Sequence, residues 1–86
     1  MLIEKKLNRT EKTYGYLFWL AENDNQIKEI LKNTVMIDAK IGDRTIFSRN
    51  VDLNRRRIYL GSALKNLNCD KVRITITSKY VDIECK

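Results

Sequence analysis

The chain has 86 residues, of which 17 are lysine or arginine, 11 are aspartate or glutamate and none is histidine, for a net charge of +6 at pH 7. A chain of this length makes one small domain, and it buries only about 60–65% of the surface that its unfolded form exposes. Without histidine there is no imidazole for acid–base catalysis or metal binding, and three scattered glycines do not make a phosphate-binding loop. No apolar stretch approaches the roughly 20 residues of a membrane-spanning helix, and the first residues do not resemble a signal peptide. We therefore expect a soluble, cytoplasmic protein that is not an enzyme and has no cofactor, metal or small-molecule substrate.

The first predicted elements are two strands. Leu2–Leu7 is a short apolar and charged run, and Lys12–Ala21 is rich in the aromatic residues that favour strands. In the second strand Tyr14, Tyr16 and Phe18 would share one face and Leu17 and Trp19 the other, and we expect these aromatic side chains to pack in the core or in a dimer.

A short helix is predicted over Gln26–Lys32. Ile27, Ile30 and Leu31 recur at the spacing of one buried helical stripe. The polar run Asn23-Asp24-Asn25 offers side chains that cap a helix N-terminus, and Asn33 offers a C-terminal stop.

A hairpin is predicted over Thr34–Val51. Its first arm alternates apolar and polar residues, and Gly42-Asp43 suits a two-residue turn with glycine at positive φ. The alternation of the second arm is broken near Phe47 and Ser48, which predicts a bulge there.

The last third predicts a strand, a short helix and two strands. These elements are Arg56–Leu60, Ala63–Leu67, a strand from Val72 to Thr77, and Tyr80–Cys85. Cys69 precedes the third element and Cys85 ends the fourth, so two buried thiols and a disulfide both stay open.

The net charge lies entirely in the second half of the chain. Residues 1–43 carry seven basic and seven acidic side chains, whereas residues 44–86 carry ten and four. Arg55, Arg56 and Arg57 run directly into the predicted strand, and like charges this close repel unless a polyanion offsets them. The pattern favours phosphate contacts, with a solvated edge strand or a protein interface as the alternatives.

Residues 53–86 resemble the AbrB/MazE-like swapped-hairpin DNA-binding family. The resemblance rests on Arg57-Ile58-Tyr59-Leu60, then Ala63–Leu67, then Asp70-Lys71-Val72-Arg73-Ile74-Thr75-Ile76, then Tyr80-Val81-Asp82-Ile83. It implies an intertwined homodimer, in which paired hairpins present basic residues to duplex DNA. About 34 residues cannot bury a core alone, which is a physical reason to expect a dimer.

The sequence therefore predicts a single α+β domain of mostly antiparallel strands with two short helices. It divides into a strand–helix–hairpin portion, 1–52, and a β-α-β-β portion, 53–86, in which the resemblance implies a swapped-hairpin dimer barrel. The predicted function is a small, basic, dimeric DNA-binding transcriptional regulator; the alternative is an antitoxin-like or mobile-element protein-interaction module without nucleic-acid binding. The predicted nucleic-acid contacts are Arg44, Arg49, Arg55, Arg56, Arg57 and Arg73, with Tyr59 and Tyr80 as candidates for stacking on bases.

Overall fold

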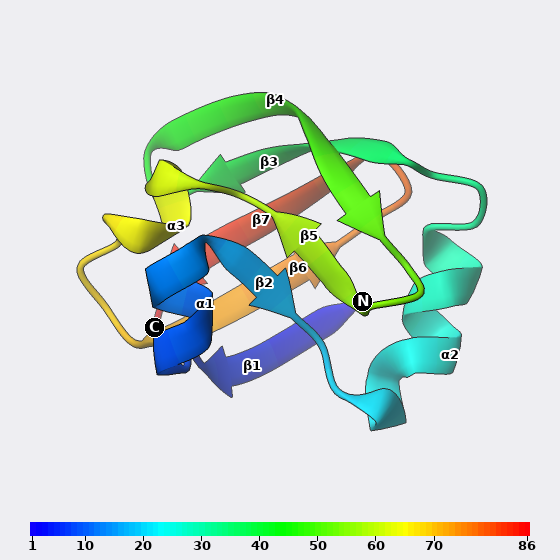
Figure 1. The fold of residues 1–86 in the computed structure, drawn as a ribbon, viewed down its shortest axis with the longest axis horizontal. Coiled ribbons are helices and arrows are strands. Elements are labelled where there is room, and N and C mark those ends of the chain that lie inside the picture. Colours follow the sequence, from blue (N-terminus) through cyan, green and yellow to red (C-terminus); the bar gives the residue numbers. More distant parts are fainter.

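The computed structural model describes residues 1–86 as an α+β domain built on one curled, seven-stranded sheet (Figure 1). The strands are β1 (Leu2–Lys6), β2 (Tyr16–Phe18), β3 (Met36–Ile41), β4 (Arg44–Asp52), β5 (Arg57–Tyr59), β6 (Lys71–Ile76) and β7 (Tyr80–Cys85). The helices are α1 (Arg9–Tyr14), α2 (Ala21–Ile30) and α3 (Ser62–Lys65). The strand order is β1-β6-β7-β3-β4-β5-β2, so β1 and β2 form the two edges.

The hairpin and the last two strands confirm the alternation in the sequence. In β3 and β6 every second side chain is buried, as expected for strands with one face on a core, and in β7 Val81 and Ile83 are buried whereas Cys85 is exposed. Gly42 has a φ of 59° in the turn between β3 and β4. The pairing of these strands shifts between Ile37 and Ala39, and Ser48 has a φ of 54°, so the predicted bulge is present.

The strands of residues 53–86 pair with strands of residues 1–52 in the same chain. β5 lies between β4 and β2, β6 pairs with β1 and β7, and β7 runs parallel to β3. The parallel pair is the one exception to an otherwise antiparallel sheet. The first half of the chain thus supplies the core that the 34-residue portion lacks, and a swapped dimer stays a prediction.

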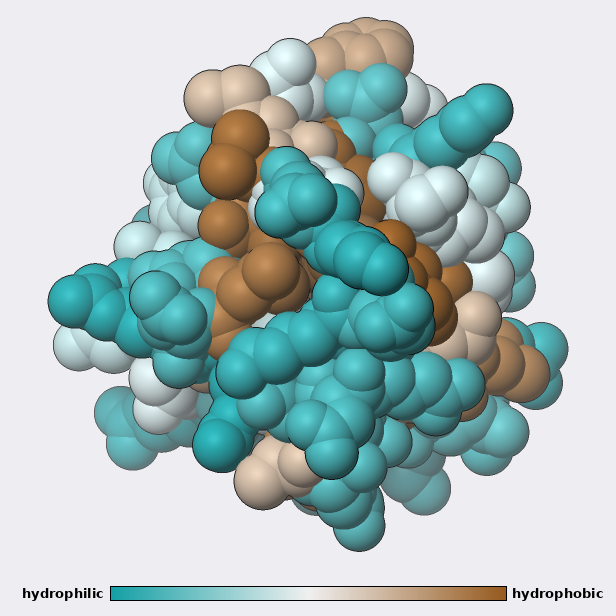
Figure 2. All heavy atoms as spheres, turned by 90° about the vertical axis from the view of Figure 1, so that its right-hand side faces the viewer, coloured by the Kyte–Doolittle hydropathy of each residue, from teal (hydrophilic) through white to brown (hydrophobic).

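The core lies on the concave side of the curled sheet, where α2 and α3 add to it. Its fully buried members include Ile27 and Leu31, which belong to the predicted helical stripe, and also Ile58 and Leu64. Viewed from the side that carries α2, hydrophobic atoms show in the gaps between protruding hydrophilic side chains (Figure 2). None of the three helices has the length and apolar content to span a bilayer.

The prediction of one strand over Lys12–Ala21 is wrong, and the chain has three helices rather than two. The first part of the predicted strand belongs to helix α1, and only Tyr16–Phe18 is strand. The side chain of Asn8 accepts from the Glu11 amide while the Glu11 carboxylate accepts from the Asn8 amide, which is a complete capping box. Gly15 then ends the helix at a φ of 74°.

Helix α2 begins five residues before the predicted start. Leu20 takes the N-cap position without a side-chain hydrogen bond, so the polar run Asn23-Asp24-Asn25 lies inside the helix. Asp24 instead accepts a hydrogen bond of 3.0 Å from the Trp19 indole. Asn33 adopts a φ of 60° in the turn after the helix, where the sequence predicted a stop.

A buried ion pair joins the two edge strands of the sheet. Glu11 is fully buried and accepts a 2.7 Å bond from Lys5 Nζ in β1 and a 2.9 Å bond from the Phe18 amide in β2. Lys5 Nζ also donates to the Phe18 carbonyl over 2.9 Å. Because β1 and β2 do not pair with each other, these side chains replace the missing strand-to-strand hydrogen bonds at this point of the seam.

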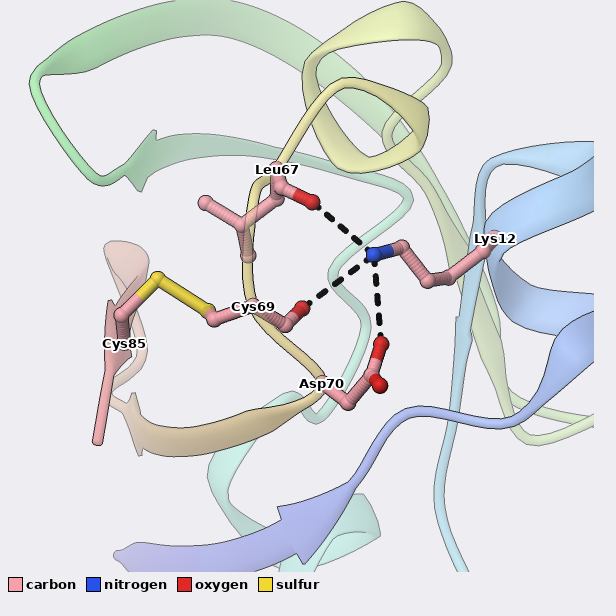
Figure 3. Close-up of a disulfide and its surroundings, with 5 residues drawn as sticks. All are labelled: Lys12, Leu67, Cys69, Asp70 and Cys85. Carbon is pink, nitrogen blue, oxygen red and sulfur yellow. Dashed lines mark hydrogen bonds and ion pairs between the residues drawn. A yellow bond between two sulfur atoms is a disulfide. The ribbon is translucent and has the colours of Figure 1, made fainter.

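The two cysteines form a disulfide, which closes the question that the sequence left open. Cys69 and Cys85 have Cα atoms 5.9 Å apart and tie the loop before β6 to the end of β7 (Figure 3). Lys12 in α1 donates to the carbonyls of Leu67 and Cys69, over 2.9 and 3.2 Å, and lies 3.4 Å from an Asp70 carboxylate oxygen. One lysine thus fixes α1 to the disulfide-bonded loop.

Candidate nucleic-acid interface

Aromatic and basic side chains gather on the outer face of β2 and β5. Tyr16 lies directly opposite Tyr59, and Phe18 directly opposite Arg57. Leu17 and Ile58, the residues between them, point to the core and are buried. Because successive side chains of a strand point to opposite sides, the four outward residues form one surface, which we call the Tyr–Arg face (Tyr16, Phe18, Arg57 and Tyr59).

The rings and the guanidinium of the Tyr–Arg face are in mutual contact. The Arg57 guanidinium carbon lies 4.2 Å from the centre of the Tyr16 ring. The Tyr16 ring centre is 5.1 Å from that of Tyr59 and 6.0 Å from that of Phe18. A cation over an aromatic face is held by the ring quadrupole, so Arg57 is fixed over a platform of partly exposed rings.

A hollow of about 380 Å³ opens beside this platform. It is lined by Tyr16, Asn50, Asp52, Arg57 and Tyr59. The Asp52 carboxylate lies 3.9 Å from Arg55 Nε and 4.0 Å from Arg57 Nε, and it accepts a 3.1 Å bond from the Arg55 amide. At these distances the carboxylate lies near both guanidinium groups without forming close hydrogen bonds to them, and the Arg57 Nε is buried without a hydrogen-bond partner.

Arg56 is directed away from the Tyr–Arg face. It has a φ of 54°, and its Nε lies 3.6 Å from Asp24 of α2. The hydrogen bond from the Trp19 indole is the main reason that the pKa of the Asp24 carboxyl lies below its ordinary value, and the hydrogen bond from the Lys28 ammonium is the next. Arg56 thus joins a structural ion-pair cluster rather than the surface beside Arg55 and Arg57.

The three remaining predicted arginines lie elsewhere. Arg73 on β6 stands in register between Glu4 of β1 and Glu84 of β7. A hydrogen bond from Lys86, with the nearby charges of Lys86 and Arg73, lowers the pKa of Glu4. Arg44 is exposed at the start of β4, and Arg49 donates to the backbone carbonyl of Phe47.

The six predicted arginines are thus spread over several regions, and only Arg55 and Arg57 share a carboxylate partner beside the aromatic rings. The predicted stacking residues are also separated. Tyr59 belongs to the Tyr–Arg face, whereas Tyr80 lies on β7 in register with Asp38, and the strands β3 and β4 lie between β7 and β5.

The sequence analysis assigned Tyr16 and Phe18 to packing in the core or in a dimer, whereas both are half-buried on the outer face of β2. The signal was present, because Tyr16 and Phe18 alternate with Leu17 and Trp19. What the sequence did not show was which of the two faces turns inward. The buried side carries Leu17 and Trp19, 2% and 7% exposed, and leaves the other two rings at the surface.

No protein-family model, curated protein or solved structure matches this chain. Its function therefore has to be inferred from its own residues.

Proposed function

We propose that the protein binds nucleic acid through the Tyr–Arg face, with unpaired bases stacking on Tyr16 and Tyr59 and phosphates contacting Arg55 and Arg57. The observation that carries the proposal is the Arg57 guanidinium 4.2 Å from the Tyr16 ring centre, beside the Tyr59 ring at 5.1 Å. Exposed rings on a sheet with arginines next to them are typical of surfaces that bind single-stranded nucleic acid. The net charge of +6 favours any polyanion at long range.

Stacking makes a single strand the preferred form. Bases inside a duplex are already stacked and present only their edges, whereas splayed bases offer the π-face that tyrosine contacts. The duplex-binding homodimeric regulator predicted from the sequence remains the competing form of this proposal, and the same titration tests both.

The test is a fluorescence-anisotropy titration with labelled single-stranded and duplex oligonucleotides of equal length. Each stacked base is worth about 1–3 kcal/mol, so Tyr59→Ala should weaken single-strand binding roughly 5–160-fold. Tyr14→Ala is the matched control, because Tyr14 is 61% exposed and lies outside the face. Equal affinities of wild type and Tyr59→Ala would refute stacking, and tighter duplex binding would favour the regulator.

Salt dependence measures the number of phosphate contacts. Two or three contacts to a single strand predict a slope of about −2 for log affinity against log salt, whereas six contacts to duplex DNA would give about −5. A salt-independent interaction would exclude both.

A protein-interaction module is the second candidate. Its support is the pairing of Arg55, Arg56 and Arg57 with Asp52 and Asp24, which reduces the charge available to phosphate. Tyrosine and arginine are also enriched in protein interfaces. Absence of oligonucleotide binding at about 50 mM salt, where phosphate contacts are strongest, would favour this candidate.

The disulfide bears on where the protein acts. Disulfides persist in oxidising compartments and in the cytosol of hyperthermophiles, and are rare in the cytosol of mesophiles. Trapping thiols with an alkylating reagent at the moment of lysis tests the cytoplasmic location, which stays a prediction. Alkylated Cys69 and Cys85 would support a reducing compartment, and blocked ones would count against it.

A further inference from the structure

A groove runs along the seam between the two edges of the sheet. It has a volume of about 350 Å³, with β1 on one side and the segment from Phe18 to Asn23 on the other. Its apolar lining residues include Ile3, Ile74, Phe18 and Trp19. It lies on the opposite edge of β2 from the strand β5, so it is separate from the hollow beside Tyr59.

Strand β1 turns a row of backbone hydrogen-bonding groups toward this seam. At its two ends, Met1 exchanges hydrogen bonds with Ile76 and the Leu7 amide donates to the Asp70 carbonyl. In an antiparallel pair the residues bonded to the partner strand alternate, so the odd-numbered residues of β1 face β6. The N–H and C=O groups of Leu2, Glu4 and Lys6 therefore point away from β6, and β1 has no other partner strand.

We propose that this groove binds an extended peptide, which adds to β1 as a further strand of the sheet. An extended chain places donors and acceptors at the spacing that Leu2, Glu4 and Lys6 present, and it needs only the width of one strand. Residues 18–23 form the second wall of the groove. This wall would obstruct the edge of another folded domain, so a single extended segment is the occupant that we propose.

The two sides of the groove define the chemistry of the peptide. On the concave side its alternate residues meet Ile3 and Trp19 and are apolar. On the convex side they meet Lys6, Lys71 and Lys86, which line a second hollow of about 250 Å³ together with Lys5 and Glu4. Since Lys5 is bonded to Glu11 and Glu4 to Lys86, Lys6 and Lys71 remain to attract acidic side chains, and the ligand alternates apolar with acidic residues.

Trp19 reports binding directly, because it is the one tryptophan of the chain and lines the groove. The probe is acetyl-Thr-Val-Asp-Val-Asp-Val-Thr-amide, and its controls are the same peptide with lysine for aspartate and one methylated on alternate backbone amides. We expect a saturable change in Trp19 fluorescence with the acidic peptide, at least tenfold weaker binding of the lysine peptide, and none with the methylated one. Absence of saturation up to ~1 mM, the weak limit of specific recognition, or equal binding of all three, would overturn the proposal.

A backbone variant separates strand addition from adhesion to the groove. Glu4→Pro removes the outward N–H of β1 without breaking a bond to β6, and edge strands tolerate proline; Glu4→Ala is the control that keeps the N–H. Peptide binding should be lost in the first variant and kept in the second. Hydrogen exchange of wild type gives an answer independent of the folding of the variant: peptide should slow exchange at the amides of Glu4 and Lys6, and unchanged exchange there would refute strand addition.

Discussion

Replacing Glu11 tests whether side chains hold the seam between β1 and β2. The carboxylate is fully buried and accepts hydrogen bonds from Lys5 Nζ, the Asn8 amide and the Phe18 amide at 2.7, 3.0 and 2.9 Å. Breaking a buried ion pair costs about 3–5 kcal/mol. Lys5 is 21% exposed and can turn toward water. We therefore expect Glu11→Ala to lower the unfolding free energy by about 3 kcal/mol, the low end of this range. Glu11→Gln keeps the shape and an acceptor suited to the capping box, so we expect about 1–2 kcal/mol.

Urea unfolding followed by Trp19 fluorescence measures these losses. The stability of a domain of this length is about 4–13 kcal/mol, so both variants should remain folded and shift the midpoint measurably. Glu29→Gln is the matched control, because Glu29 is 77% exposed and its contact with Lys32 contributes little. A Glu11→Ala variant within about 0.5 kcal/mol of wild type, the usual range of surface changes, would refute the role of Glu11. So would strict additivity of Lys5→Met and Glu11→Gln in a double-mutant cycle.

Three further predictions concern the backbone, the disulfide and pH. Gly15→Ala should lower the unfolding free energy by about 3 kcal/mol or more, and Gly42→Ala by about 1–2 kcal/mol, as measured by urea unfolding. Both glycines have positive φ, but a Cβ at Gly15 would lie 2.7 Å from backbone atoms of the loop before α3. At Gly42 the nearest atom to such a Cβ is a side-chain carbon at 3.8 Å. Equal costs would mean that the close approach at Gly15 does not matter. Reducing the Cys69–Cys85 bond, which links residues 16 apart, should lower the unfolding free energy by about 3 kcal/mol, and an unchanged midpoint in reductant would contradict this. The pKa of Asp24 lies below its ordinary value of 3.8 in the folded state. The ionised carboxylate therefore stabilises the fold above that pH, and this stabilisation is lost as pH falls through the folded pKa. Asp24→Asn should flatten the acid limb of the stability–pH curve, and an unchanged limb would refute this prediction.

The regular strands could be predicted from the sequence because their burial is one-sided. Apolar and polar residues alternate from Ile37 to Ile41 in β3, from Lys71 to Ile76 in β6 and from Val81 to Cys85 in β7, and the core selects the apolar side. The segment Lys12–Ala21 was misinterpreted because its aromatic content favoured one strand. The capping-box spacing of Asn8 and Glu11, followed by Gly15, is the local signal that would have identified α1.

The candidate site was only partly predictable, because it depends on which strands become neighbours. Arg57 and Tyr59 are close in sequence, but Tyr16 reaches them through pairing between residues more than 40 positions apart. The charge pattern predicted six arginines as nucleic-acid contacts but did not show which carboxylates they pair with. Asp24, for example, reaches Arg56 only because α2 begins before the polar run. Parallel pairing of β3 and β7 is equally absent from local periodicity.

Strand β2 links the stability of the fold to both proposed surfaces. It has only three residues, so its ladder with β5 is short. On its other edge the Phe18 amide and carbonyl are held by Glu11 and Lys5. The Phe18 ring belongs to the Tyr–Arg face, and Phe18 is also one of the residues that line the groove. A peptide in the groove would therefore contact the same residue that supports the rings on which bases are proposed to stack. Because Glu11 lies in neither the hollow nor the groove, it acts on both surfaces only through the position of β2, as a positioning residue.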